Sequence, residues 1–365
     1  MLEALRLKNF KCFKTQTISL KPLTFLSGVN GMGKSTIIQS LLLLRQSQDK
    51  QAFELNGELF DFGYLEDLHS EFADDEDFIV ALKGEGTKEI KWHSLIKSDD
   101  KGELYSQLQT WPTLTPFTQN LFGQDFQFLS AERWGPRITT PLNRDNVART
   151  YLGKHGEFLV SVLEAFEHKQ LPNKNLPIHP QTTSRDVHTQ ISAWLNEISP
   201  GSTFNIKAIK EADSGITTFS YRSKLGKSRA FRPTNVGFGL SYTLPILTAL
   251  MTAPQNALII MENPEAHLHP KAQMVLGKLL GICANAGVQL IVESHSDHVL
   301  NGIRIAVKEN LLSKEDVALH FINRADYLDI ASTEVITPTM LKGGKLSAWP
   351  AGFFDEWDNA LDQLL

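Results

Sequence analysis

"GVNGMGKST", Gly28 to Thr36, is the stretch that decides the fold. Gly28 and the run Gly33-Lys34-Ser35 have the spacing of a phosphate-binding loop, with four residues between the glycines and then Lys and Ser. "PLTFLSG" enters the loop as a predicted buried strand, and "KSTIIQSLLLLRQS" leaves it as a predicted helix with a broad apolar face. This order of strand, glycine loop and helix is the context that the motif requires, so we expect a nucleoside triphosphate here.

The loop residues have separate expected functions. Backbone N–H groups and the N-terminus of the following helix stabilise phosphate oxygens. Lys34 is expected to reach the β- and γ-phosphates of ATP, and Ser35 to bind Mg²⁺. The residues expected to bind the nucleotide are Gly28, Asn30, Gly31, Gly33, Lys34, Ser35 and Thr36.

Composition narrows the class of protein. Of the 365 residues, 42% are hydrophobic and 21% are charged, which is typical of globular proteins with one large core or two lobes. No apolar run reaches the ~18–20 residues of a membrane helix, and the N-terminal stretch does not read as a signal peptide. Cys12 and Cys283 are the only cysteines, so a reducing cytoplasm is expected. The net charge of −5 gives no overall attraction to nucleic acid, but it leaves room for a local basic surface.

Two apolar strands in the last third end in polar residues. "ALIIMENPE" ends its strand at Glu262, where a Mg²⁺-binding carboxylate is expected. "VQLIVESHS" is followed by His295, which is well placed to sense a γ-phosphate. Each polar cluster opens a predicted helix, so both clusters are expected at the carboxyl edge of one sheet, where ligands bind in α/β folds.

These motifs resemble those of one group of proteins. "GVNGMGKST" with Asn30 and Gly31, the opening "LRLKNFKCF", "ENPEAHLHP" and "ESHSDHVL" are similar to ABC-type ATPases of the SMC/RecF-like branch of AAA proteins. "NVGFGLS" occupies the place of the signature motif, which in that family contacts the γ-phosphate bound by the opposite subunit. Its best matches are Gly237, Gly239 and Ser241. "FLSAERWGPR" and the closing "LSAWPAGFFDEW" resemble one subfamily with a short C-terminal domain of unknown function.

The resemblance implies an α/β fold, an ABC-type ATPase head with a mixed central sheet, an antiparallel β subdomain and a helical insertion. The expected segments are the N-terminal part of the head (1–140), the helical insertion (141–203), the C-terminal part of the head (204–335) and the short C-terminal domain (336–365).

One position departs from the family. A glutamate there normally follows the Mg²⁺-binding acid and polarises the attacking water, but this chain has Asn263, whose amide is not a base. Either Glu265 or Glu262 has taken that function, or hydrolysis is slow and ATP acts chiefly as a clamp. Catalytic candidates are therefore Glu265, Glu262, Asn263 and His295, and the metal ligands expected are Ser35 and Glu262.

The resemblance also implies partners. Two heads are expected to sandwich ATP in a homodimer or higher oligomer. The roughly 70 residues after His295 are fewer than an ordinary ~100-residue domain, so they are not expected to form an effector domain. Such a stand-alone subunit resembles the ATPases of bacterial anti-phage defence, which implies a separate effector, a nuclease or toxin. One alternative is a DNA-repair or DNA-end-binding ATPase, in which DNA would contact a basic loop that can equally be a solvated hairpin (Lys224, Lys227, Arg229 and Arg232). Another is an ATP-gated scaffold with little hydrolysis.

Overall fold

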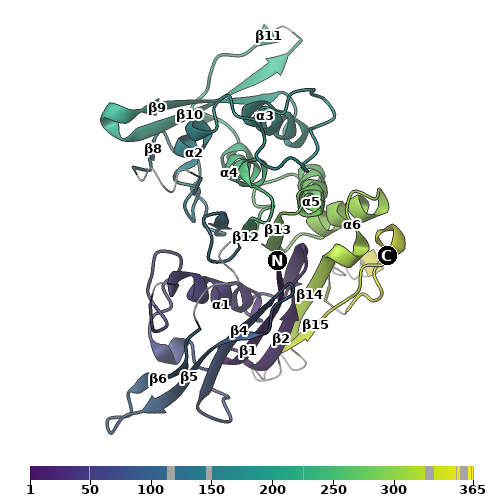
Figure 1. Ribbon diagram of the computed structural model, residues 1–365. Helices are drawn as coiled ribbons and strands as arrows, with labels where there is room; N and C mark the ends of the chain where they lie inside the picture. The colour runs from purple at the N-terminus through teal and green to yellow at the C-terminus, as the bar shows by residue number, and fades with distance from the viewer. Residues whose placement is uncertain are drawn as a thin grey trace. The chain divides into compact units, whose positions relative to one another are not determined.

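The computed structural model describes residues 1–48, 50–112, 120–144, 150–224, 226–324 and 333–350, with 352, 353, 361, 362 and 364. The chain forms two compact units (Figure 1). Unit 1 consists of Met1–Gly123, Val317–Met340 and Leu346–Leu365, and unit 2 of Gln124–Asp316 and Leu341–Lys345. These units are defined by contacts between residues in space, whereas the four segments expected from the sequence were defined by motifs. The four-segment division therefore stays a prediction.

An antiparallel sheet forms the first part of unit 1. Its order is β2-β1-β4-β5-β6. The strands are β1 (Leu2–Phe10), β2 (Phe13–Ser19), β4 (Asp77–Gly84), β5 (Ile90–Ser98) and β6 (Leu104–Thr110). Alternating residues of β1, such as Leu5 and Leu7, are buried, which is the period of two that predicted a hairpin at the start of the chain. The expected antiparallel subdomain is confirmed.

The phosphate-loop motif lies in the second part of unit 1. β3 (Leu23–Gly28) is buried along most of its length and leads through the glycine loop to α1 (Lys34–Gln46). β14 (Val317–Arg324) pairs in parallel with β3 and antiparallel with β15 (Thr333–Ile336), so this sheet is mixed. Phe353 packs edge-on against Phe321 of β14, with ring centroids 5.1 Å apart. The predicted order of strand, loop and helix is confirmed.

Unit 2 contains a parallel sheet in which β12 (Leu258–Glu262) lies between β7 (Phe126–Leu129) and β13 (Gln289–Glu293). α5 (Pro270–Asn285) follows β12 and α6 (Asp297–Lys308) follows β13, as predicted. Glu262 pairs in register with Glu293, so the two polar clusters share one edge of the sheet. In β7 the apolar Phe126 and Phe128 alternate with the polar Gln127, a pattern that favours a strand with one solvated face. All of β7 is nevertheless buried, because parallel strands are commonly covered on both faces.

The remainder of unit 2 combines helices with an antiparallel ribbon. α2 (Leu159–Ala165) and α3 (Val187–Ile198) confirm the two predicted helices of the insertion. β9 (Ser202–Ile209) and β10 (Ser214–Ser223) form the ribbon, with β8 (Thr140–Pro141) and β11 (Gly226–Lys227) at its sides (Figure 1). α4 (Phe238–Thr252) begins after Gly237, where the signature-like stretch was expected to open a helix. Short 3-10 turns of both units are η1 (Leu65–Asp67), η2 (Lys210–Ala212), η3 (Pro233–Asn235), η4 (Lys314–Asp316) and η6 (Lys342–Gly344).

Across the described ranges, no helix combines the length and apolar character needed to cross a membrane.

Candidate functional site

The glycine loop of unit 1 closes around a lysine. Lys34 is only 4% exposed, and its Nζ donates hydrogen bonds to the carbonyl oxygens of Gly28 and Val29, both at 3.0 Å. α1 begins at Lys34 with no side-chain cap on its first turn, so the backbone N–H groups of that turn are oriented for an anion. Arg324, at the end of β14, donates to the Gly31 carbonyl at 3.2 Å. The loop is therefore a preformed cradle that fits a phosphate group.

Gly28 has a second reason to be glycine. Its φ is 142°, and a Cβ there would lie 2.0 Å from the carbonyl oxygen of Ile322 in β14. The close pairing of β3 with β14 thus requires glycine at the position where the loop starts. Of the other loop residues, Asn30 and Gly31 are exposed, Ser35 is half-buried, and Thr36 is buried with its Oγ1 3.9 Å from Cys12 Sγ.

Glu262 ends β12 in unit 2, as predicted. Its Oε2 accepts a hydrogen bond from the Ala131 N–H at 3.0 Å. Burial raises the pKa of this carboxyl, and the Ala131 N–H and the nearby charge of Arg133 partly oppose that increase. Asn263 follows in a left-handed conformation with φ of 44°, and its N–H donates to the Glu293 carbonyl at 2.8 Å. The end of this strand is therefore held on several sides.

Arg133 also binds the turn formed by Glu262 and Asn263. Its Nη1 donates to the carbonyl oxygens of Ser130 at 2.9 Å and Glu262 at 2.6 Å, and its Nη2 donates to that of Asn263 at 2.6 Å. The residue is 2% exposed, and burial lowers its pKa to about 10, so it stays charged at neutral pH. Arg133 lies in "FLSAERWGPR", which stood out in the sequence only by its resemblance to one subfamily.

Two of the catalytic candidates, Glu265 and His295, lie in contact. Glu265 Oε1 accepts a hydrogen bond from the backbone N–H of His295 at 2.8 Å, while the imidazole of His295 belongs to an exposed residue. Three buried polar atoms around this turn have no hydrogen-bond partner in the described structure: Glu265 Oε2, Asn263 Oδ1 and Arg133 Nε. Unsatisfied buried groups are rare in native proteins, so this cluster suits a polar ligand or ordered water.

The signature-like residues differ in accessibility. Gly237 faces open space, whereas a Cβ on Gly239 would lie 2.8 Å from the carbonyl oxygen of His267. The ring of His267 contacts that of Tyr242, with centroids 4.5 Å apart. The Ser241 hydroxyl is buried without a partner and lines a cavity of about 40 Å³. The Ser241 hydroxyl therefore faces the interior of unit 2.

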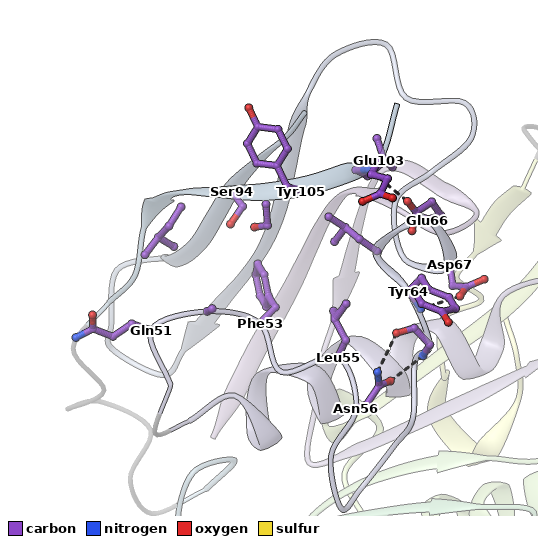
Figure 2. A pocket seen from close by; sticks show the side chains of 16 residues that line it. Gln51, Phe53, Leu55, Asn56, Tyr64, Glu66, Asp67, Ser94, Glu103 and Tyr105 are labelled. Atoms are coloured by element: carbon purple, nitrogen blue, oxygen red, sulfur yellow. Dashed lines mark hydrogen bonds between the residues drawn. The ribbon is translucent and has the colours of Figure 1, made fainter. Parts of the chain in front are cut away.

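A pocket of about 980 Å³ lies elsewhere in unit 1, between residues 51–67 and strands β5 and β6 (Figure 2). Phe53 and Leu55 point into the space beneath β6, and Glu66, Asp67 and Glu103 lie at one end. Its described lining holds three carboxylates and no cation, so it does not suit a triphosphate. None of the predicted site residues lines it.

Comparison with known proteins gives the family. Residues 23–301 match the family described as "AAA domain, putative AbiEii toxin, Type IV TA system". The chain belongs to this AAA family. Residues 312–364 of this AAA protein match a second family, a "Protein of unknown function (DUF3696)". No curated protein is significantly similar to it.

Solved structures show the fold. The AAA protein is similar to an Smc head bound to the C-terminal winged-helix domain of ScpA, with 14% identity, a TM-score of 0.52, and coverage of 93% of this chain and 98% of that chain. An Smc head from Pyrococcus furiosus with an extended coiled coil, bound to the C-terminal domain of ScpA, has 13% identity, a TM-score of 0.50, and coverage of 100% and 99%. The α/β fold of an SMC-type ATPase head, with mixed and antiparallel sheets, is thereby confirmed.

The donors present fit Mg²⁺ only together with a nucleotide. Among the described residues, no group of three or more His, Cys, Asp and Glu side chains could hold a metal alone. Mg²⁺ is commonly bound by one or two protein oxygens together with substrate phosphates and water. Ser35 in unit 1 and Glu262 in unit 2 are each an oxygen donor of that kind, and nucleotide binding is what membership of the AAA family implies.

Proposed function

We propose that this AAA protein is a cytoplasmic ATPase that dimerises around ATP and Mg²⁺ and thereby controls a separate effector, a nuclease or toxin of bacterial anti-phage defence. The family description supports the link to an effector, since it names a toxin of a toxin–antitoxin system. Hydrolysis is slow, because the position of the usual catalytic glutamate is Asn263.

The proposed functions of the residues follow the motifs. The loop Gly28–Thr36 binds the phosphates, with Lys34 on the β- and γ-phosphates and Ser35 on Mg²⁺. Glu262 is the candidate carboxylate ligand of Mg²⁺, Glu265 is the candidate base, and His295 senses the γ-phosphate. The N-terminus of α4, at Gly237 and Gly239, meets the nucleotide of a second subunit, since helix N-termini favour anions.

The observation that carries the proposal is the cradle around Lys34. Replacing Lys34 with Ala is expected to abolish ATP binding, because the loop loses its cation. The buried side chain also fills the loop, so Lys34→Met is the better variant: it preserves volume and removes only the charge. The exposed Lys14→Met is the matched control.

Fluorescent ATP-analogue binding to the purified proteins gives the readout, with thermal unfolding as a check of folding. We expect at least a tenfold loss of affinity in Lys34→Met and none in Lys14→Met. Unchanged affinity in a folded Lys34→Met protein would refute the assignment of this loop.

A second candidate function, DNA binding, is favoured by the β10–β11 hairpin. Lys224, Lys227, Arg229 and Arg232 are all exposed, and Arg229 stacks on Phe231 at 5.2 Å. Within the described part of the chain, none of the four is in an ion pair, unlike Lys210, which pairs with Glu164. Four unpaired cations within the short segment from Lys224 to Arg232 fit the regularly spaced phosphates of duplex DNA.

Salt dependence of binding to a duplex tests this candidate. Each phosphate contact contributes about −0.9 to the slope of log K against log salt, so alanine at all four positions is expected to flatten the slope by roughly 3.6. A control variant removes the same charge from unit 1, at exposed Lys83, Lys88, Lys91 and Lys101. Equal slopes for the two variants would exclude the hairpin as a DNA contact.

A further inference from the structure

Arg133 is an unusual residue to bury. It is 2% exposed, and the ion pairs of the described residues do not include it. Removing a cation from water is unfavourable unless other groups solvate it, and an apolar side chain would fill the same space without that cost. The guanidinium is solvated by three carbonyl oxygens, those of Ser130, Glu262 and Asn263. The burial of Arg133 is therefore explained by the three carbonyl groups that its guanidinium binds.

Two of these carbonyl groups belong to Glu262 and Asn263, the residues whose geometry the proposed ATPase needs. The planar fork of an arginine holds several donors in a fixed arrangement on separate nitrogens, which the single ammonium of a lysine does not reproduce. Here it spans Glu262 and Asn263, and the Ala131 N–H of the same short segment binds the Glu262 carboxylate. Main chain and side chain of Glu262 are thus both fixed by residues 130–133. Asn263 has a φ of 44°, a conformation that persists only where neighbouring groups enforce it.

The other face of the guanidinium contacts helix α4. Arg133 Cζ lies 5.6 Å from the centroid of the Tyr242 ring, in a cation–π contact. Tyr242 stands on the first turns of α4, and its ring also packs on His267, whose carbonyl oxygen abuts Gly239. A displacement of the N-terminal turns of α4 would therefore reach the Glu262 turn through Tyr242 and Arg133.

We propose that Arg133 is a positioning residue of the ATPase, which sets the turn carrying Glu262 and Asn263 and transmits the position of α4 to that turn through Tyr242. This inference rests on ATP hydrolysis as the proposed function. It adds a residue outside the nucleotide motifs and a physical link between the signature-like helix and the Mg²⁺-binding strand, both within unit 2.

The experiment compares Arg133→Met and Arg133→Lys with Arg137→Met. Arg137 is an exposed arginine four residues further on that stacks on Trp134 at 4.2 Å and makes none of the bonds to the Glu262 turn. Two quantities are measured for each protein: ATP-analogue affinity with and without Mg²⁺, and phosphate release at saturating ATP. Affinity without Mg²⁺ reports the loop of unit 1 and also whether the protein binds nucleotide.

Supporting groups behind a metal ligand typically change metal affinity or activity 10–100-fold. We expect Arg133→Met to lose turnover in that range and to lose most of the gain in ATP affinity that Mg²⁺ gives, while affinity without Mg²⁺ changes less than about threefold. Arg133→Lys keeps the charge without the fork, so it is expected to resemble Arg133→Met. A merely structural arginine would instead lower all quantities together and would be rescued by lysine.

Tyr242 provides an independent variant should the Arg133 proteins fail to fold. Tyr242→Phe keeps the ring and is expected to retain turnover, whereas Tyr242→Leu is expected to lose it severalfold without a change in ATP affinity. Wild-type turnover in both Tyr242 variants, or Mg²⁺-dependent affinity and turnover in Arg133→Met equal to those of Arg137→Met, would overturn the inference alone. A wild-type protein that neither binds nor hydrolyses ATP would overturn the proposed function with it.

Discussion

Asn263 has a conformational explanation that its sequence context does not reveal. Non-glycine residues rarely adopt positive φ, and Asn is among the side chains that tolerate it best. With a φ of 44°, the turn after β12 accepts Asn more readily than Glu. The sequence marks only the loss of a general base, whereas the structure shows that the backbone also favours the amide.

Substitutions at the turn separate base chemistry from backbone strain. Asn263→Glu adds a carboxylate, so we expect faster turnover, together with a loss of stability of about 1 kcal/mol from the strained φ. Asn263→Gly, the matched control, accepts the same φ and should change stability little. Steady-state phosphate release and thermal unfolding measure the two effects, and an Asn263→Glu protein as slow as Asn263→Gly would argue against a missing base.

Glu265 is tested by the same assay. If its carboxylate takes the proton of the attacking water, Glu265→Gln should retain ATP binding and slow hydrolysis by roughly 10²–10⁴-fold. Wild-type turnover is expected well below ~10 s⁻¹, an ordinary enzyme median. Fast wild-type turnover that Glu265→Gln leaves unaltered would contradict the proposal that ATP is hydrolysed slowly and acts chiefly as a clamp.

Site residues that belong to a local sequence motif could be predicted from the sequence. Residues that act through contacts with distant parts of the chain could not. Lys34 and Glu262 lie in spaced patterns next to a strand. Arg133 acquires its environment from a strand about 130 residues further along the chain, which no local pattern encodes. The burial of the Ser241 hydroxyl likewise depends on how α4 packs in unit 2.

Helices and strands were predicted better than site residues or units. The hydrophobic periodicity of an element and the residues that end it are both local features of the sequence. Strand–loop–helix order was read correctly three times, at β3, β12 and β13. β7 was the exception, since burial on both of its faces comes from other elements.

β14 contains a buried histidine that makes stability depend on pH. His320 Nε2 donates to the Ser19 carbonyl at 2.7 Å, and burial lowers the pKa of the imidazole below its ordinary 6.5. As the pH falls below about 6.5, the imidazole of His320 binds a proton in the unfolded chain but not in the folded chain. The free energy of unfolding therefore decreases from pH 6.5 down to the lower pKa that His320 has in the folded protein.

His320→Gln is expected to flatten this part of the stability curve, because glutamine can donate to Ser19 without titrating. Urea unfolding between pH 7 and 5 gives the slope, with the exposed His168→Gln as control. Identical slopes in the wild type and His320→Gln would assign the pH dependence to other groups.

For the whole molecule, the central prediction is dimerisation that requires ATP. A bulky residue at Gly239 of the signature-like stretch is not a clean test, because a side chain there meets the His267 backbone and would disturb unit 2 itself. Gly237 has open space and a φ of −60° that any residue adopts, so Gly237→Trp changes only the surface at the start of α4. Gly237→Ser is the matched control.

Sedimentation with ATP and Mg²⁺ is expected to show dimers for the wild type and Gly237→Ser, and monomers that still bind ATP for Gly237→Trp. The same dimer fraction in all three proteins, or a wild-type dimer that forms equally without nucleotide, would exclude the ATP-sandwich arrangement. The sequence could not supply the division into units, because unit 1 joins segments from both ends of the chain.

This discontinuous path matters while the protein is being made. Most of unit 2 is one uninterrupted stretch, whereas β3 must wait for β14, which is encoded almost 300 residues later. At about 5–20 residues per second, a ribosome needs roughly 15–60 s to supply that partner. Throughout this interval the apolar β3 has an unpaired edge and the nucleotide loop lacks its Arg324 contact. The nascent chain is therefore expected to depend on chaperones and to acquire ATP binding only late in its synthesis.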